Sequence, residues 1–379
     1  MRLLTVANHI GARGGLERTQ LTMSRSLAAR GHGVDLVYVT PGDFTEDWRA
    51  FASRMVQIDG TLPRARQPLG SSLGVVEAAA QVRRLRPDLI YVFRPLDIPF
   101  AVSVGALCRA PVVLHLCLPK PARLPVVVRR SLRHVALTLS VSRDTADLWR
   151  HTGLERGGME VIHTGIDMNH YVPSSADDRL AARDALGIEP SAFVVLFAGR
   201  IASVKGVDVL VRAFCEVAAD EPAASLIVVG GSSLSADPDD AKRYAGGLRA
   251  LGASCDVRWL DARKDVLPLI QMADVVVAPS RWAEPFSRSV IEPLACGVPV
   301  IATRVGGNPE ILTGWLADYL VPPDDVPALA KRIRSLVSWR SSDPDLGSRC
   351  RAAVVERLSL DREVEAVEAA LTAVAAAGR

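Results

Sequence analysis

Residues 279–310 read PSRWAEPFSRSVIEPLACGVPVIATRVGGNPE, and this stretch decides the fold. The apolar run before it, residues 275–278, is typical of a buried strand. A polar loop follows, and the pattern after Pro285 predicts a helix that ends at Gly297, a residue type that favours a left-handed cap. Residues 300–302 predict the next strand. This order of strand, loop, helix and strand indicates one unit of a parallel α/β sheet.

Two glutamates lie around the start of this helix: Glu284 precedes it, and Glu292 lies about one turn inside. The free amides of residues 286–289 form an anion site at the helix N-terminus. Glu284 follows a strand end, where open α/β sheets bind ligands. The amides could bind phosphates, and the carboxylates could accept hydrogen bonds from sugar and ribose hydroxyl groups. This combination suits a sugar nucleotide. The alternative is a capped surface helix with two solvated glutamates, and the spacing alone favours neither.

The segment EPFSRSVIEPLACGVPVIATRVGGNPE resembles the donor-site signature of the retaining glycosyltransferases of family 4, which have the GT-B fold. That signature has two glutamates separated by seven residues, here Glu284 and Glu292. A glycine and proline after the helix, a Gly-Gly pair and Glu310 complete it. The resemblance implies an α/β protein with two facing Rossmann-like domains, a cleft between them, and a last helix that crosses back to the N-terminal domain.

Length and composition are those of a two-domain globular chain, with 379 residues of which 49% are hydrophobic. No run of 18 uncharged apolar residues occurs, so no membrane-spanning helix is expected, and the first residues predict a strand rather than a signal peptide. Six cysteines are scattered without metal-ligand spacing. They predict free thiols in a reducing cytoplasm and no metal site.

Charge is divided unevenly along the chain. Residues 1–173 carry 22 Lys and Arg against 14 Asp and Glu, whereas residues 174–379 carry 23 against 28. A basic N-terminal half suggests an acidic partner, such as an anionic membrane surface or a phosphorylated acceptor. Residues 120–133 suit peripheral contact with an anionic membrane, although a solvated basic helix is the favoured interpretation. Nucleic acid is not expected as a partner, because no basic motif is interleaved with aromatic residues.

Two further candidates lie in the N-terminal half. A Gly-Gly pair before a predicted helix lets backbone amides approach a phosphate, and GGLE resembles the first loop of the family, which implies that Gly15 contacts the donor phosphates. PVVLHLCLP resembles the family's strand that ends in an active-site histidine, which implies this role for His115. A lone histidine at a strand end is otherwise more often structural.

Two cations follow the first predicted strand of the C-terminal half, residues 194–198. Arg200 and Lys205 suit a diphosphate, because a buried dianion needs fixed cations. FAGRIASVKGVDVLVRAF resembles the family's motif in which these two residues clamp the donor diphosphate. Gly231 follows a strand predicted over 226–229, where the family lines its donor cleft.

The resemblance implies an acceptor-binding Rossmann-like domain at 1–173, a nucleotide-sugar-binding domain at 174–360, and a helix at 361–379 that packs back on the first domain. The polar segment 173–190 predicts the junction. The implied activity is that of a retaining, metal-independent glycosyltransferase of the hexosyltransferase type without cofactor. It would move a sugar from a nucleotide-sugar, with UDP favoured over GDP, to a hydroxyl of a lipid, polysaccharide or small-molecule acceptor.

The catalytic residues implied are His115, Glu284, Arg200 and Lys205. The residues implied to bind the donor are Gly15, Gly231, Arg200, Lys205, Glu284, Phe286, Ser287, Arg288 and Glu292, with no metal ligand. The expected location is the cytoplasm, at the inner face of the membrane if residues 120–133 contact lipid. Three alternatives stay open: a nucleotide-sugar 2-epimerase of the same fold, a non-catalytic sugar-nucleotide-binding subunit, and an NAD-dependent oxidoreductase, which lacks its glycine fingerprint here.

Overall fold

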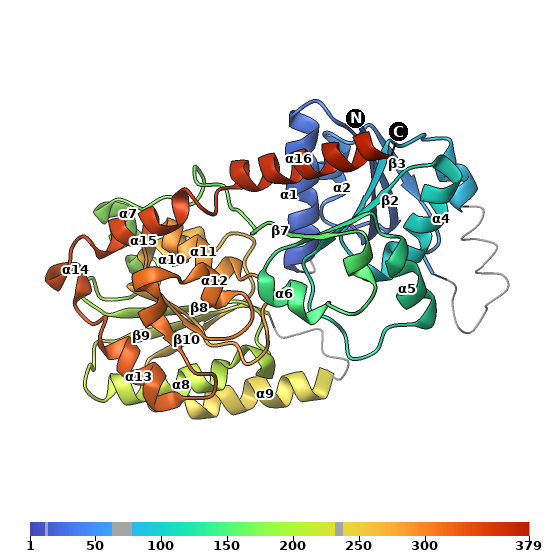
Figure 1. Ribbon diagram of the computed structural model, residues 1–379. Helices are drawn as coiled ribbons and strands as arrows, with labels where there is room; N and C mark the ends of the chain where they lie inside the picture. Colours follow the sequence, from blue (N-terminus) through green and yellow to red (C-terminus); the bar gives the residue numbers. More distant parts are fainter. Residues whose placement is uncertain (12–13, 63–77, 232–237, 379) are drawn as a thin grey trace. The chain divides into compact units, whose positions relative to one another are not determined.

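The computed structural model describes residues 1–11, 14–62, 78–231 and 238–378. The chain divides into two compact units: unit 1 is Met1–His163 with Asp361–Arg379, and unit 2 is Thr164–Leu360. Each unit is built on its own parallel sheet with helices around it (Figure 1). This is the doubly wound α/β architecture that the sequence predicts.

The sheet of unit 1 has the strand order β3-β2-β1-β4-β5-β6-β7, and every pair is parallel. Its strands are apolar runs because helices cover both faces. The inner strands were predicted from these runs, whereas the edge strands β3 and β7 are short and partly exposed and were not. The strands are β1 Arg2–His9, β2 Gly33–Thr40, β3 Arg54–Gln57, β4 Leu89–Val92, β5 Val112–Leu116, β6 Leu137–Ser140 and β7 Met159–Val161.

The helices of unit 1 include the last helix of the chain, α16, which lies beside α1 (Figure 1). Glu368 of α16 contacts His32 Nε2 at 2.7 Å and accepts a hydrogen bond from Arg30 Nη1 at 2.8 Å. The sequence also predicts a helix over residues 70–86, of which 70–77 lie outside the described residues and 78–83 are helical. The other helices are α1 Gly15–Ala29, α2 Thr45–Arg49, η1 Pro95–Asp97, α4 Ile98–Cys108, α5 Val126–Ser131, η2 Leu132–His134, α6 Arg143–Leu148, η3 Leu154–Arg156 and α16 Leu360–Ala377.

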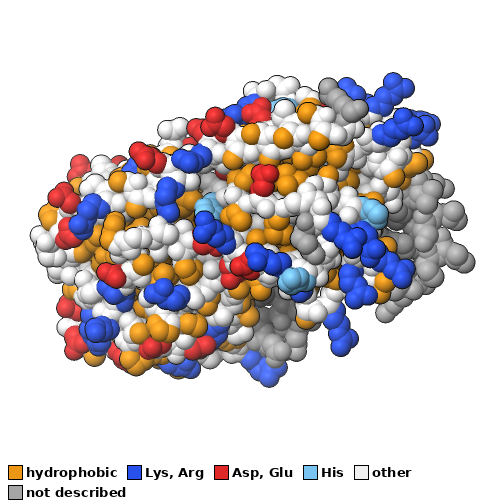
Figure 2. Space-filling model, viewed as in Figure 1, with side chains coloured by type: hydrophobic (Ala, Val, Ile, Leu, Met, Phe, Trp, Pro, Cys, Tyr) orange, Lys and Arg blue, Asp and Glu red, His pale blue; other side chains and the backbone are white. Residues whose placement is uncertain are grey.

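The basic segment 120–133 contains α5. Val126 and Val127 begin this helix and are about half exposed, at 53% and 48%. Lys and Arg side chains gather on the surface over α5 (Figure 2). The segment therefore presents apolar and cationic side chains together. None of the helices in the described parts of the chain is long and apolar enough to cross a membrane.

The sheet of unit 2 has the order β10-β9-β8-β11-β12-β13, again with all pairs parallel. The sequence analysis predicted β8, β9, β11 and β12 from their apolar runs. The strands are β8 Val194–Ala198, β9 Ser225–Val229, β10 Val257–Leu260, β11 Val275–Ala278, β12 Val300–Thr303 and β13 Leu320–Val321. The helices are α7 Ala176–Asp184, η4 Ser203–Lys205, α8 Val207–Ala218, α9 Pro238–Leu251, α10 Leu267–Met272, α11 Arg288–Ala295, α12 Asn308–Ile311, η5 Gly314–Tyr319, α13 Val326–Arg334, α14 Trp339–Ser342 and α15 Leu346–Val355.

The boundary between the units lies at 163/164 rather than at the predicted 173/174. Residues 164–173 belong to unit 2 because Ile166 exchanges main-chain hydrogen bonds with Leu358 and Leu360, at 3.0 and 2.8 Å. Arg351 adds hydrogen bonds to main-chain oxygens of the same segment. The predicted linker 173–190 also contains a helix, α7, whose N-cap Ser175 accepts a hydrogen bond from the Asp178 amide.

The prediction of six free thiols is wrong for two cysteines. Cys215 of α8 and Cys255, which precedes β10, form a disulfide with their Cα atoms 5.7 Å apart. They are separated by 40 positions, so only the packing of the end of α8 near β10 brings them together. The disulfide removes the cysteine content as an argument for a reducing compartment.

Candidate functional site

The strand order of unit 2 reverses between β8 and β11. The chain passes from β8 to β9 on one side and from β11 to β12 on the other, so the loops after β8 and β11 diverge at the carboxyl edge. Such a switch point is where open α/β sheets bind ligands. The loop after β8 carries Arg200 and Lys205, and the loop after β11 carries Glu284.

Lys205 and Glu284 form an ion pair across this switch point. Their side chains are 18% and 12% exposed. The Ser280 hydroxyl donates a second hydrogen bond to the same carboxylate oxygen of Glu284, at 2.6 Å. The ammonium of Lys205 also lies 5.7 Å from the ring centre of Trp282. The structure thus brings together two residues that lie 79 positions apart in the chain.

Two glycines allow these loops to approach so closely. Gly206 has φ +65°, and a Cβ there would lie 2.1 Å from the main-chain oxygen of Pro279. Gly306, in the loop after β12, has φ +55°, and its Cβ would lie 2.1 Å from the oxygen of Glu284. Any other residue type at either position would push the Glu284 loop away.

Arg281 holds the turn that presents Lys205, a role that the sequence analysis missed. Its Nη1 donates to the main-chain oxygen of Ser203 at 2.7 Å, and its amide donates to the oxygen of Val204 at 2.9 Å. Its two Nη atoms also bind both carboxylate oxygens of Asp208, at 2.7 and 2.8 Å. An arginine beside Trp282 and Glu284 carries no separate sequence signal, so only tertiary contacts identify this role.

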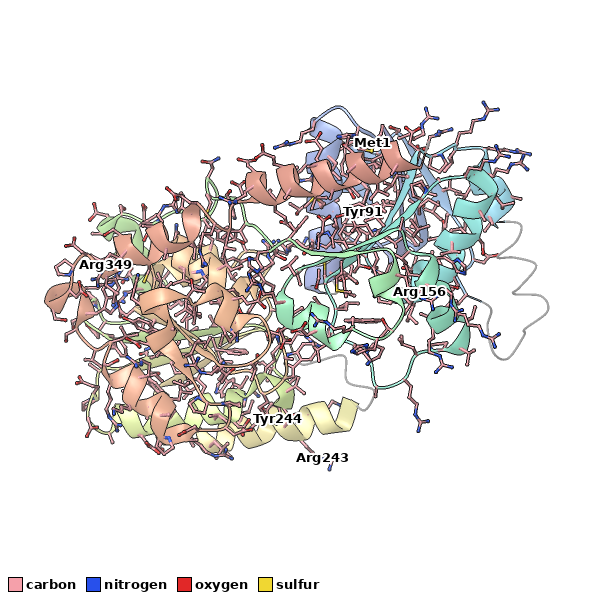
Figure 3. All side chains as sticks on the ribbon, viewed as in Figure 1. Met1, Tyr91, Arg156, Arg243, Tyr244 and Arg349 are labelled. Atoms are coloured by element: carbon pink, nitrogen blue, oxygen red, sulfur yellow. A yellow bond between two sulfur atoms is a disulfide. The ribbon has the colours of Figure 1, made fainter. Side chains whose placement is uncertain are left out.

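Asp208 is fixed in turn by α9. The phenol of Tyr244 donates to Asp208 Oδ1 at 2.8 Å, and Figure 3 shows Tyr244 on this helix. Burial opposes ionisation of Asp208, but hydrogen bonds from Arg281 and Tyr244 hold the pKa of the carboxyl below its ordinary value. Asp208 is therefore a fixed anion that anchors Arg281 at neutral pH.

The N-terminus of α11 lies directly after Glu284. Ser287 is the N-cap residue and is nearly buried, as is Phe286 before it. The first-turn amides of α11, at Arg288 and Ser289, have no partner within the helix, and the positive end of its dipole favours an anion there. The structure places a helix terminus between the two glutamates, and the anion site there stays a prediction.

Glu292 lies in the second turn of α11, with a side chain that is 13% exposed. Arg288 Nε donates to Glu292 Oε1 at 2.9 Å, and the phenol of Tyr171 bonds to both side chains. Burial and then the Glu292 carboxylate raise the pKa of Tyr171 to about 12. Burial alone would lower the pKa of Arg288, but Glu292 and Tyr171 raise it above its ordinary value. Tyr171 is a second neighbour of the site that the sequence analysis missed.

Two other predicted residues lie at the same edge of unit 2. Arg200 is exposed, and its guanidinium has no hydrogen-bond or ion-pair partner among the residues that the structure describes. Gly231 follows β9, and its main-chain oxygen accepts a hydrogen bond from the amide of Ile201 at 2.9 Å. Arg200 is thus available for an anionic ligand, and Gly231 holds the start of the loop that carries it.

In unit 1, Gly15 is the first residue of α1, and a Cβ at this position would meet no atom within 4 Å. The loop before it is only partly described. Its exposed first-turn amide is consistent with the predicted phosphate contact, which stays a prediction.

His115 lies at the end of β5 and is fully buried. Its Nδ1 lies 2.5 Å from the phenol oxygen of Tyr91, a residue inside the first unit (Figure 3), and its ring stacks on Phe93. Burial raises the pKa of Tyr91 well above its ordinary value and lowers that of His115 to about 4. The phenol therefore donates to a neutral imidazole, whose Nε2 has no partner in the described chain. The predicted contact with a sugar stays a prediction.

No group of three His, Cys, Asp or Glu residues in the described chain could hold a metal ion. The sequence does contain two Asp-Pro-Asp stretches with the spacing of a carboxylate pair. In the stretch 343–345, Asp343 is ion-paired with Arg349 at 2.5 Å and Asp345 is the N-cap of α15. The stretch 237–239 lies partly outside the described residues.

Comparison with known proteins gives consistent matches over both units. Residues 178–352 match the family described as glycosyl transferases group 1, and residues 13–170 match Glycosyltransferase Family 4. The D-inositol 3-phosphate glycosyltransferase of Mycobacterium sp. (strain KMS) is 39% identical over 184 residues, which are 48% of this chain and 39% of that protein. That of Rhodococcus opacus (strain B4) is 37% identical over 230 residues, 58% of this chain and 49% of the relative. The matched regions span less than half the length of these two relatives.

Solved structures resemble the whole chain at lower identity. HepE of Anabaena, solved in complex with UDP, has a TM-score of 0.84 at 22% identity and covers 98% of this chain and 100% of its own. Sucrose-phosphate synthase of Thermosynechococcus elongatus has a TM-score of 0.78 at 21% identity, with 100% of both chains covered. At such identities the likeness concerns the fold. The two family matches, with the ordered motifs, show that the chain belongs to the family 4 glycosyltransferases, and the solved structures show that it has the GT-B fold.

Proposed function

We propose that this protein transfers a sugar from a UDP-sugar to an acceptor hydroxyl group. The observation that carries the proposal is the Lys205–Glu284 pair at the switch point of unit 2, beside the free N-terminus of α11. A fixed cation and unpaired amides suit a diphosphate, and a carboxylate suits sugar hydroxyl groups. The relatives are named as glycosyltransferases, which supports sugar transfer, and the UDP bound to HepE supports a UDP-sugar as donor.

The proposed roles follow from the charges. Lys205 and Arg200 neutralise the diphosphate, and the α11 amides add hydrogen bonds as charge grows on its leaving oxygen. Glu292 accepts hydrogen bonds from the ribose, whereas Glu284, Phe286 and Ser287 hold the sugar. The family resemblance further implies that Gly15, Gly231 and Arg288 contact the donor and that His115 orients the donor sugar or the acceptor.

The proposed reaction retains the anomeric configuration and needs no metal. The bond from the sugar C1 to the diphosphate oxygen breaks, and a bond from C1 to the acceptor oxygen forms on the same face. The acceptor's proton passes to the departing diphosphate oxygen, so no separate base is required. Two cationic side chains supply the charge compensation that a metal ion gives in other phosphate sites.

The acceptor class is the least constrained part of the proposal. The relatives are named for D-inositol 3-phosphate, so a phosphorylated cyclitol is the first acceptor to test, followed by lipid and polysaccharide acceptors. Exposed Val126 and Val127 beside the cations of α5 support peripheral contact with the anionic inner face of a membrane, and hence a cytoplasmic location.

The first experiment is calorimetric titration of the metal-free protein with UDP and with GDP. Selective UDP binding supports the donor assignment, and binding of neither nucleotide contradicts it. Incubation with a panel of UDP-sugars and acceptors, with and without a chelator, then tests transfer and metal independence. NMR of the product's anomeric proton tests retention. Donor conversion without acceptor would indicate an epimerase, and binding without any turnover would indicate a non-catalytic subunit.

A further inference from the structure

A large hollow in unit 2 lies at the opposite edge of the sheet from Lys205 and Glu284. Its volume is about 880 Å³, within the range of pockets that hold small molecules. Gly297 and Val298, which line it, directly precede β12, so the hollow lies at the amino ends of the strands. The donor residues described above follow the carboxyl ends. This hollow is therefore a separate site.

Much of its wall is apolar. Leu180 of α7 lines it and is 40% exposed. Val355 of α15 faces the same space. The other apolar lining residues include Pro173, Val298, Trp339 and Pro344. A ligand with an apolar body would remove this surface from water.

The rest of the wall carries more cations than acids, because Arg179, Arg340 and Arg351 line it against Glu356 alone. Arg179, Arg183 and Arg340 all bind the carboxylate of Asp274, at 3.4, 2.8 and 2.8 Å. No other carboxylate in the described chain pairs with these three guanidinium groups, so two positive charges are uncompensated. Arg179 and Arg340 line the hollow, and they also line a neighbouring one of about 390 Å³.

Arg179 in particular has an unused donor. Its Nε is buried and has no hydrogen-bond partner in the described chain. Burial, and then the charge of Arg340, lower the pKa of Arg179 to about 10. A buried donor without an acceptor is unfavourable, and so is a cation beside two others. An anion at this wall would relieve both.

A third cation lies further along the wall. Arg351 lines the hollow and donates to the main-chain oxygens of Met168, Tyr171 and Ala295, but it forms no ion pair with a carboxylate in the described chain. The first turn of α15 adds Gly347 and Ser348, whose amides have no partner within the helix. Both features favour negative charge in the same space.

We propose that this hollow binds a small amphipathic anion. Its acidic group, a carboxylate or a phosphate, lies between Arg179 and Arg340, and its apolar body lies against Leu180, Trp339 and Val355. A divalent cation between Arg179 and Arg340 would meet two like charges, and their carboxylate partner Asp274 is already shared among three guanidinium groups. A neutral apolar ligand would leave the two excess charges of the arginine cluster without a counter-ion.

The test uses 8-anilinonaphthalene-1-sulfonate, a fluorescent apolar anion, and N-phenyl-1-naphthylamine, which has the same rings without the charge. The purified full chain should bind the sulfonate at least about tenfold more tightly than the amine. Arg179→Gln should remove this preference, and Arg179→Lys should keep most of it. Arg334→Gln, which removes a cation paired with Asp220 on the surface, is the control and should change nothing.

A second variant separates binding from misfolding. Ala352 lines the hollow, and Ala352→Trp fills it without changing charge, so both probes should lose binding while the circular dichroism spectrum stays unchanged. Ala250→Trp, on the exposed face of α9, is the matched control. The proposal is overturned if the sulfonate binds Arg179→Gln and Ala352→Trp as it binds the wild type, or if saturating UDP excludes it completely, which would place both ligands in one site.

Competition then identifies the acidic group. Decanoate and decyl phosphate should displace the sulfonate, and the stronger competitor names the carboxylate or the phosphate as the preferred group. Decanol should fail at the same concentration. Equal displacement by decanol would contradict a role for the arginines.

Discussion

Replacing Lys205 with alanine is expected to weaken UDP binding about 30- to 150-fold. The change removes the cation that the loop after β8 presents at the switch point. It also leaves Glu284 without its partner in a place where the carboxylate is 12% exposed. Both effects oppose the binding of a diphosphate, so they act in the same direction.

The magnitude follows from burial. Two unit charges about 4 Å apart interact by about 4 kcal/mol at the effective dielectric constant of a protein surface. The Lys205 side chain is 18% exposed, so water replaces part of the lost interaction. A loss of about 2–3 kcal/mol remains, which corresponds to the stated change in Kd.

The assay is calorimetric titration of UDP into the wild type and the variant, with Lys331→Ala, an exposed lysine of α13, as the control. Glu284→Gln gives the sharper comparison, because it removes a negative charge that competes for Lys205. It should tighten UDP binding several-fold while it reduces sugar transfer. A Kd for Lys205→Ala within twofold of the wild type would refute the clamp. Equal weakening by both variants would show that the pair is only structural.

Three further variants test other parts of the structure. Arg281→Lys loses the paired hydrogen bonds that hold the turn of Lys205, so kcat/KM should fall about 10- to 100-fold in a sugar-transfer assay without loss of fold. Burial lowers the pKa of His115 from its ordinary value of 6.5 to about 4, so between these pH values the unfolded chain binds a proton that the folded chain does not. The stability that the neutral, buried His115 contributes is therefore complete above pH 6.5 and declines as the pH falls below it. From about pH 7.5 to about pH 5.5 the wild type should lose about 1.3 kcal/mol of unfolding free energy that His115→Gln retains, measured by urea unfolding. Cys215→Ser opens the disulfide with Cys255 and should lower the unfolding free energy by about 3–4 kcal/mol, whereas a reducing agent should make both proteins equal.

The sequence predicted most of the sheet because its strands are buried on both faces. Val275–Ala278 and Val194–Ala198 are continuous apolar runs, and such runs need no knowledge of neighbours to be recognised. The helix after Glu284 was equally clear, because a glycine commonly ends a helix in the left-handed conformation. Gly297 does adopt φ +72° at the end of α11. The proposed donor residues of unit 2 rest on family resemblance, since the spacing of the two glutamates alone also fits a surface helix.

What the sequence could not predict depends on tertiary contacts. The segment 173–190 looks like a linker, yet Arg183 of α7 is buried there and donates to the main-chain oxygens of Met272 and Ala192. These acceptors come from other parts of unit 2, so no local sequence pattern predicts the helix. The disulfide and the role of Arg281 are of the same kind, because each joins residues that are distant in sequence.

Tyr171 connects the two sites of unit 2. Its main-chain oxygen accepts a hydrogen bond from Arg351 at the wall of the amino-edge hollow, and its phenol bonds to Glu292 and Arg288 at the donor edge. An anion that attracts the Arg351 side chain into the hollow would weaken the hydrogen bond from Arg351 to the Tyr171 main-chain oxygen. The Tyr171 phenol would then shift, and the Glu292 carboxylate that it contacts would change its position toward a ribose. Linkage requires the effect to be reciprocal, so UDP must change the affinity for the amphipathic anion by the same factor by which that anion changes the affinity for UDP. Tyr171→Phe keeps the main-chain contact but removes the phenol, so it should abolish this coupling while each ligand still binds alone.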